Sequence, residues 1–167
     1  MAYHVPVLTD VSIDFDILTR LADISNFVGL KYSDYNLYEL SRFLKLKEGE
    51  FIVLEGNDEV LLPALLVGAH GGVGMSYSLM PELYEKMYLA HKAGEYEKAK
   101  IYQRKINQVI EVLDRYGLAG YKLTMKWLGV DCGEPRLPLR RLSSEEIERL
   151  KGELNEIDFK NILNREE

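Results

Sequence analysis

Short apolar segments alternate with amphipathic stretches along the first half of the chain. The apolar segments are YHVPVL (3–8), FVGLKY (27–32), FIVLEG (51–56) and GGVGMSY (71–77). Apolar runs of this length, bounded by turn-type residues, are typical of strands that are buried on both faces of a parallel sheet. We therefore expect four strands in this part of the chain.

The stretches between these segments carry apolar residues at helical spacing. SIDFDILTRLADI (12–24) begins with Ser12, a residue type that often caps a helix. NLYELSRFLKL (36–46) places its apolar residues on one face, and DEVLLPALLVGA (58–69) has Pro63 near its first turn, where proline is tolerated. Strands and helices that alternate at this spacing predict right-handed βαβ units, a parallel sheet and an α/β fold.

The pattern changes to helices alone after the fourth segment. Residues 80–115 have apolar positions at helical spacing, and Gly94 is expected to divide them into two helices. Gly117 is expected to end the second of these helices, because glycine commonly follows the last helical turn.

Three further segments complete this helical part of the chain. GYKLTMKWLGV (120–130) predicts another helix, and EPRLPLRRLS (134–143) predicts an extended linker that contains proline. SEEIERLKGEL (144–154) predicts a last helix, which either Ser143 or Ser144 caps.

Four βα units are too few to close a parallel barrel. A closed (β/α)8 barrel has eight strands, and an open sheet of four leaves two unpaired edges, which proteins usually cover. We therefore expect residues 1–79 to form half of a barrel and residues 80–167 to form the last barrel helix and a helical extension. The open edges predict a partner or self-association.

Composition places the chain among ordinary globular proteins. It has 167 residues, of which 47% are hydrophobic and 29% charged, and its formal net charge of −6 leaves no basic patch for nucleic acid. The single cysteine, Cys132, rules out an internal disulfide and fits a reducing compartment. Residues 1–10 lack the pattern of a signal peptide, and no apolar run approaches the roughly 20 residues of a membrane helix. We expect a cytoplasmic protein without membrane contacts.

Lys31 is the unexpected residue of the second apolar segment. A lysine at a strand end usually extends its amine to solvent, and periodicity alone favours this interpretation. The alternative is an amine kept among apolar neighbours, where desolvation favours the unprotonated, nucleophilic form. The carboxyl ends of the strands are where parallel barrels place their active sites.

Four motifs carry a resemblance to a known family. YHVPVLTDV, FVGLKYSDYNLYEL, FIVLEGNDEVLLPALLVGAHGGVG and EPRLPLRRLS, in this order, resemble the second half of the N-acetylneuraminate lyases. These are class I aldolases related to dihydrodipicolinate synthase. The resemblance covers nearly the whole chain and implies that the four segments are strands 5 to 8 of a (β/α)8 TIM barrel.

The resemblance implies a reaction and two catalytic residues. Lys31 would form a Schiff base with a 2-keto acid, without a metal or any other cofactor, and the phenol of Tyr3 would relay protons. The implied reaction is the cleavage of N-acetylneuraminate to N-acetylmannosamine and pyruvate. A commoner role for Tyr3, as one of 11 tyrosines, is core packing.

The resemblance also implies the residues that bind substrate: Ser33, Gly56, Asp58, Glu59, Gly74 and Met75. The pair of Asp58 and Glu59 would bind sugar hydroxyls, whereas dihydrodipicolinate synthases lack such a pair. Met75 departs from the pattern, because lyases commonly have a serine there, and this departure puts the sugar specificity in doubt. Helix chemistry alone also explains an acidic pair at a first turn, and a turn explains Ser33.

Two rival functions and three assembly states stay open. The rivals are another pyruvate aldolase, either dihydrodipicolinate synthase-like or acting on keto-deoxy sugar acids, and a non-catalytic subunit that binds a longer relative. The family is usually homotetrameric, and its first half supplies the loop that grips the keto-acid carboxylate. Without that half, the chain fits a truncated product, one part of a split enzyme or a self-pairing half-barrel. The three histidines show no metal-ligand spacing.

Overall fold

The computed structural model describes residues 1–163, apart from the side chains of residues 48 and 49. The chain has two compact units, Met1–Gly74 and Met75–Glu167. The expectation that a half-barrel occupies residues 1–79 stays a prediction.

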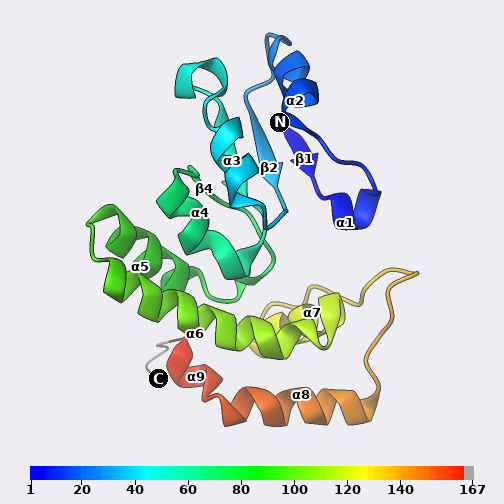
Figure 1. Cartoon of the computed structure of the whole chain (residues 1–167). Coiled ribbons are helices and arrows are strands. Elements are labelled where there is room, and N and C mark those ends of the chain that lie inside the picture. The colour runs from blue at the N-terminus through cyan, green and yellow to red at the C-terminus, as the bar shows by residue number, and fades with distance from the viewer. Residues whose placement is uncertain (164–167) are drawn as a thin grey trace. The chain divides into compact units, whose positions relative to one another are not determined.

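The first unit is built on a parallel sheet. Its elements are β1 (Ala2–His4), α1 (Pro6–Thr9), α2 (Phe15–Ala22), β2 (Gly29–Tyr32), α3 (Leu37–Phe43), the 3₁₀ turn η1 (Leu46–Gly49), β3 (Ile52–Glu55), the 3₁₀ turn η2 (Asp58–Val60), α4 (Leu61–Val67) and β4 (Gly71–Gly72). The strands pair in the order β1-β2-β3-β4, and all three pairings are parallel (Figure 1). Within residues 1–163, β1 and β4 are the sheet edges. The predicted parallel four-stranded sheet is confirmed.

One face of this sheet carries the core of the first unit. Alternate strand residues face the helices, so Leu30, Tyr32 and Val53 are fully buried there. They belong to a cluster with residues of α2, α3 and α4: Leu18, Leu40, Phe43 and Ala64. Residues of the opposite register, Tyr3, Lys31 and Leu54, face away from this cluster and are not fully buried.

Two expectations about the first unit are wrong in detail. The first strand ends at His4, because Pro6 begins the short helix α1; proline lacks an N–H group and suits a first helical position. Ser12 does not cap the next helix. Asp14 does, accepting a hydrogen bond from the Ile17 N–H at 2.8 Å. The Ile13 N–H donates instead to His4 Nδ1 at 3.1 Å, which holds this segment next to β1. The helix therefore begins later than expected, at Phe15.

The regular elements of the second unit, up to residue 163, are all helical. Its elements are η3 (Ser76–Ser78), α5 (Pro81–Lys92), α6 (Tyr96–Asp114), α7 (Gly117–Trp127), α8 (Ser144–Glu156) and α9 (Phe159–Ile162). Gly94, with φ of 75°, separates α5 from α6 as predicted. Ser143 caps α8 through a capping box with Glu146. Residues 134–143 form a linker without helix or strand, but it is not extended throughout as predicted, because the Leu139 N–H donates to the Arg136 carbonyl at 3.0 Å and closes a turn.

The prediction for Gly117 is wrong. The helix α6 ends at Asp114, and Gly117 is the first residue of α7. Its φ of 57° reverses the chain between the two helices, a conformation that glycine adopts without strain. The short helix α9 was not predicted, because four residues are too few to show a period.

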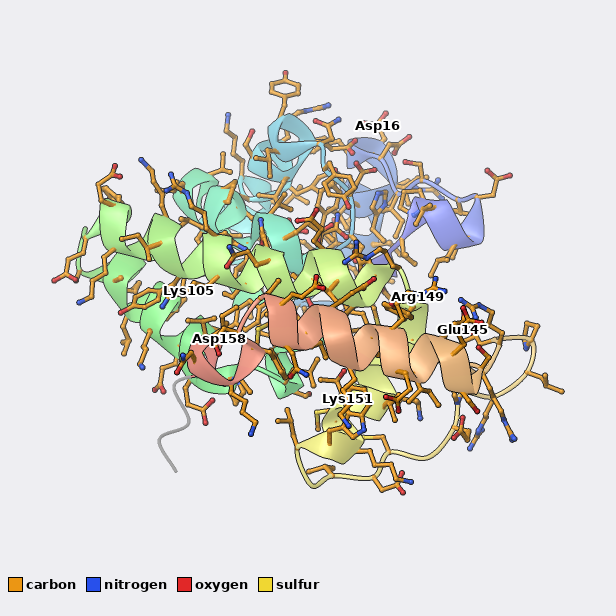
Figure 2. The ribbon with its side chains drawn as sticks, turned by 90° about the horizontal axis from the view of Figure 1, so that it is seen from below. Asp16, Lys105, Glu145, Arg149, Lys151 and Asp158 are labelled. Carbon is orange, nitrogen blue, oxygen red and sulfur yellow. The ribbon has the colours of Figure 1, made fainter. Side chains whose placement is uncertain are left out.

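The helix α8 presents charged residues to solvent. Figure 2 shows Glu145, Arg149 and Lys151 along this helix. Arg149 Nη2 lies 2.9 Å from Glu145 Oε1 in an exposed i,i+4 pair, which contributes little to stability. No helix among the described residues is both long and apolar enough to cross a membrane.

Candidate active site

Tyr3 and Lys31 lie side by side on adjacent strands. They are register partners in the β1–β2 pairing, so both side chains project from the same face of the sheet. Lys31 Nζ lies over the Tyr3 ring, 4.2 Å from its centroid, in a cation–π contact. Among the described residues, no carboxylate forms an ion pair with Lys31. The amine is therefore held by an aromatic ring, which leaves its nitrogen available to a substrate.

The Tyr3 phenol has a perturbed acidity. The neighbouring Ser33 hydroxyl and the Lys31 ammonium stabilise the phenolate and hold the pKa of Tyr3 below its ordinary value of 10.0, against the opposing effects of desolvation and of the Asp58 carboxylate. The side chain is half exposed. A phenol with a lowered pKa exchanges its proton more readily at neutral pH.

Ser33 and Gly56 complete the surroundings of Lys31. Ser33 follows β2 and its N–H donates to the His4 carbonyl at 2.8 Å, while the Gly56 N–H donates to the Tyr32 carbonyl at 2.7 Å. A Cβ added at Gly56 would lie 1.9 Å from Ser33 Oγ and 3.0 Å from Lys31 Cε. Glycine lets the chain after β3 pass this close to the other two side chains without displacing either of them.

We expect Gly56→Ala to destabilise the first unit by about 1–3 kcal/mol, because the new methyl group overlaps the Ser33 hydroxyl. Gly71→Ala is the matched control, since a Cβ there meets only Leu54 Cδ2 at an ordinary 3.7 Å. Denaturant unfolding of both variants measures the effect. Equal midpoints for the two variants would show that the site does not need glycine at position 56.

The acidic pair lies in the chain that follows β3. Asp58 is buried in the turn η2, and a Cβ at Gly74 would lie 1.3 Å from Asp58 Oδ1, so these two residues are in contact. Glu59 Oε1 accepts a hydrogen bond from the Tyr35 hydroxyl, which comes from the loop between β2 and α3. The structure thus joins Asp58 to Gly74 and Glu59 to Tyr35.

The remaining predicted residue, Met75, begins the second unit and is half exposed. Its role in binding stays a prediction.

Sequence reasoning missed Glu55, the last residue of β3. It is fully buried on the helix-covered face, in register with Tyr32. Its Oε1 accepts hydrogen bonds from the N–H groups of Gly56 at 2.9 Å and Asn57 at 2.8 Å. Burial raises the pKa of this carboxyl from 4.5 to about 7, although the two N–H groups oppose the shift. A glutamate closing an apolar segment was the only signal for it in the sequence.

His4 of β1 lies beside Tyr32, on the same face of the sheet. Its buried ring stacks on Tyr32 with centroids 4.9 Å apart, and Nε2 lies 3.6 Å from Asp34 Oδ2. Among the described residues, no group of three or more histidine, cysteine or acidic side chains is placed to hold a metal ion.

Comparison with known proteins identifies the family. A sequence model of the dihydrodipicolinate synthetase family matches residues 1–157. The chain belongs to the dihydrodipicolinate synthetase family. It is 29% identical to the 4-hydroxy-tetrahydrodipicolinate synthase of Archaeoglobus fulgidus over 161 residues, 95% of this chain and 55% of that protein. It is 33% identical to the N-acetylneuraminate lyase of Homo sapiens over 163 residues, 94% of this chain and 51% of that protein.

The solved structures agree with this assignment. The N-acetylneuraminate lyase of Proteus mirabilis superimposes with a TM-score of 0.85 at 29% identity, over 94% of this chain and 54% of that one. The chain therefore spans about half the length of the relatives it matches. The predicted half of a TIM barrel is confirmed, since these neighbours are TIM-barrel enzymes.

The family is one of class I aldolases that use a Schiff base and no metal cofactor. Synthases and lyases match this chain about equally well. The comparisons therefore identify the family but do not identify the substrate.

Proposed function

We propose that this chain carries the Schiff-base lysine of an N-acetylneuraminate lyase, and that Lys31 is this residue. The observation that carries the proposal is the contact of Lys31 Nζ with the Tyr3 ring, 4.2 Å from its centroid, near the carboxyl ends of β1 and β2. An amine that has no carboxylate partner within residues 1–163 as described, and that lies beside a proton-exchanging phenol, suits imine formation.

The proposed reaction proceeds through a covalent imine. The Lys31 amine adds to the C2 carbonyl of the open-chain sugar acid, and loss of water gives a protonated imine. The imine takes up the electron pair of the C3–C4 bond as that bond breaks, while Tyr3 accepts the proton of the C4 hydroxyl. N-acetylmannosamine leaves, the enamine is protonated at C3, and water releases pyruvate and the free amine.

The acidic pair supports a polyol substrate. Asp58 lies against Gly74, and Glu59 is oriented by the Tyr35 hydroxyl, so two carboxylates are fixed in the loop beside Lys31 and Ser33. Carboxylates accept hydrogen bonds from sugar hydroxyls. The second candidate is a 4-hydroxy-tetrahydrodipicolinate synthase, because the chain matches the Archaeoglobus fulgidus enzyme about as well as it matches the lyases.

Borohydride trapping tests the proposal. The chain is incubated with pyruvate and borohydride, alone and together with a separately produced first half of a lyase, and adducts are located by peptide mapping. We expect an adduct on Lys31. An adduct that forms only in the mixture would assign the chain to a split site. Absence of an adduct under both conditions would leave the non-catalytic subunit as the better interpretation.

The substrate is tested separately from the lysine. Trapping with N-acetylneuraminate in place of pyruvate, with release of N-acetylmannosamine measured by chromatography, should give the same Lys31 adduct. Trapping by pyruvate without any cleavage of N-acetylneuraminate would favour the synthase or another pyruvate aldolase.

Replacing Tyr3 by phenylalanine removes the proton relay and keeps the ring under Lys31. We expect Tyr3→Phe to slow adduct formation on the order of 100-fold, the usual size of a general acid–base contribution, while Lys31 remains the trapped residue. A time course of borohydride-quenched samples measures the rate. Tyr38→Phe, a change at an exposed tyrosine of α3, is the control. Equal rates for both variants would remove Tyr3 from the chemistry.

A further inference from the structure

We propose that Glu55 is a positioning residue for the loop that carries Asp58 and Glu59. Its neutral carboxyl group holds this loop in place, and ionisation of the group allows the loop to open. Glu55 touches no proposed substrate atom, because it lies on the helix-covered face of the sheet. The effect of Glu55 on substrate binding rests on the proposed function. The hydrogen bonds by which it holds the loop are independent of that function.

The hydrogen bonds of Glu55 define the start of this loop. Oε1 accepts from the consecutive N–H groups of Gly56 and Asn57, the two residues that connect β3 to the turn η2. The Glu55 carbonyl also accepts the Val73 N–H at 2.8 Å, which joins the same residue to the end of β4. One buried residue therefore fixes the loop from its base.

The second carboxyl oxygen of Glu55 has no hydrogen-bond partner in the described part of the chain. Oε2 is buried and accepts no hydrogen bond from the described residues. A buried carboxylate with one unsatisfied oxygen is costly, and the protonated form lowers this cost.

Two acidic groups near Glu55, Glu59 of the loop itself and Asp34 of the loop after β2, increase the cost of its charge. The other titratable groups on this face are Tyr32 of β2, the Glu39 carboxylate of α3, which accepts from the Tyr32 hydroxyl, and the His4 ring of β1, which stacks on Tyr32. Burial is the main cause that raises the pKa of Glu55 to about 7, and the Glu59 and Asp34 carboxylates add to it. Burial thus brings the ionisation of Glu55 to neutral pH.

Ionisation of Glu55 favours opening of the loop. An opening that exposes this carboxyl to water restores its ordinary pKa of 4.5, so the open form binds fewer protons between pH 4.5 and 7. The population of the open form therefore rises with pH across this window. Asp58 and Glu59, which would bind sugar hydroxyls, are therefore best ordered at the acidic end of this pH window.

Hydrogen exchange of the Gly56 and Asn57 amides tests the inference on the full chain. After correction for intrinsic exchange rates, we expect protection of both amides to fall on the order of 100-fold between pH 5 and pH 8. In Glu55→Gln, the amide oxygen still accepts both N–H groups and does not titrate, so protection should be retained and nearly independent of pH.

Glu39→Gln is the matched control, because it removes a carboxyl from the same face without touching the loop, and it should leave the pH dependence in place. Protection that is the same in the wild type and in Glu55→Gln at every pH would overturn the inference. So would loss of the pH dependence in Glu39→Gln alone.

A binding measurement separates this inference from the proposed function. The concentration of N-acetylneuraminate that gives half-maximal trapping should rise with pH in the wild type more than in Glu55→Gln, while that of pyruvate, which has no polyol chain, should not differ. Failure to trap either substrate would overturn the proposed function. The hydrogen-exchange measurement would then decide alone whether Glu55 holds the loop. Equal pH dependence for the two substrates would overturn the link from Glu55 to sugar binding.

Discussion

Lys31→Arg should abolish trapping of pyruvate and N-acetylneuraminate by this chain. A guanidinium group stays protonated at every accessible pH and cannot add to a carbonyl, so no imine can form. Arginine keeps the positive charge over the Tyr3 ring, where Lys31 Nζ lies 4.2 Å from the centroid, and therefore keeps the cation–π contact. The variant thus removes the nucleophile and preserves the local packing. Intact mass after borohydride treatment measures the result.

Lys45→Arg provides the matched control. Lys45 is an exposed lysine that follows α3, and its replacement should leave the adduct unchanged. An adduct that persists in Lys31→Arg would show that another lysine reacts and would remove the main support for an aldolase site. Thermal unfolding of both variants shows whether a loss of signal reflects chemistry or loss of the fold.

The sheet was predictable because each strand is a short apolar run bounded by turn-type residues. Burial on the helix-covered face requires Leu30, Tyr32 and Val53 to be apolar or aromatic, and this requirement is visible in the sequence. Helix starts were less predictable, since a cap depends on where the preceding segment is held. The Ile13 N–H is bound by His4, nine residues earlier, and the first available cap after it is Asp14.

The site was predictable where it depends on motifs at the ends of strands. It was not predictable where it depends on which face of the sheet a strand residue occupies. Strand pairing brings Tyr3 to Lys31, and the close passage of the chain at Gly56 brings Ser33 to the same place. Glu55 ends a strand, and a glutamate in such a position usually reaches solvent. Its burial follows from register with Tyr32 across β2 and β3, which the sequence alone does not specify.

Stability of the folded chain should fall as pH rises from 4.5 to about 7, because of Glu55. Its pKa is about 7 in the folded state, against an ordinary value of 4.5, so the unfolded chain ionises first and binds fewer protons in this window. Below pH 4.5 the carboxyl is neutral in both states and costs nothing. Above pH 7 the full cost is present, about 3 kcal/mol in the free energy of unfolding.

Glu55→Gln isolates this contribution, because all other titrating groups are shared with the wild type and cancel in the difference. Urea unfolding at pH 4.5 and pH 8 should show the variant gaining about 3 kcal/mol relative to the wild type between the two conditions. Tyr32, whose pKa burial raises above its ordinary value of 10.0, does not titrate in this range. Parallel stability curves for the two proteins would mean that Glu55 reaches water in the folded state. The stability difference could depend on pH while hydrogen exchange of the Gly56 and Asn57 amides does not. That result would mean that the buried charge destabilises the whole fold and does not open the loop.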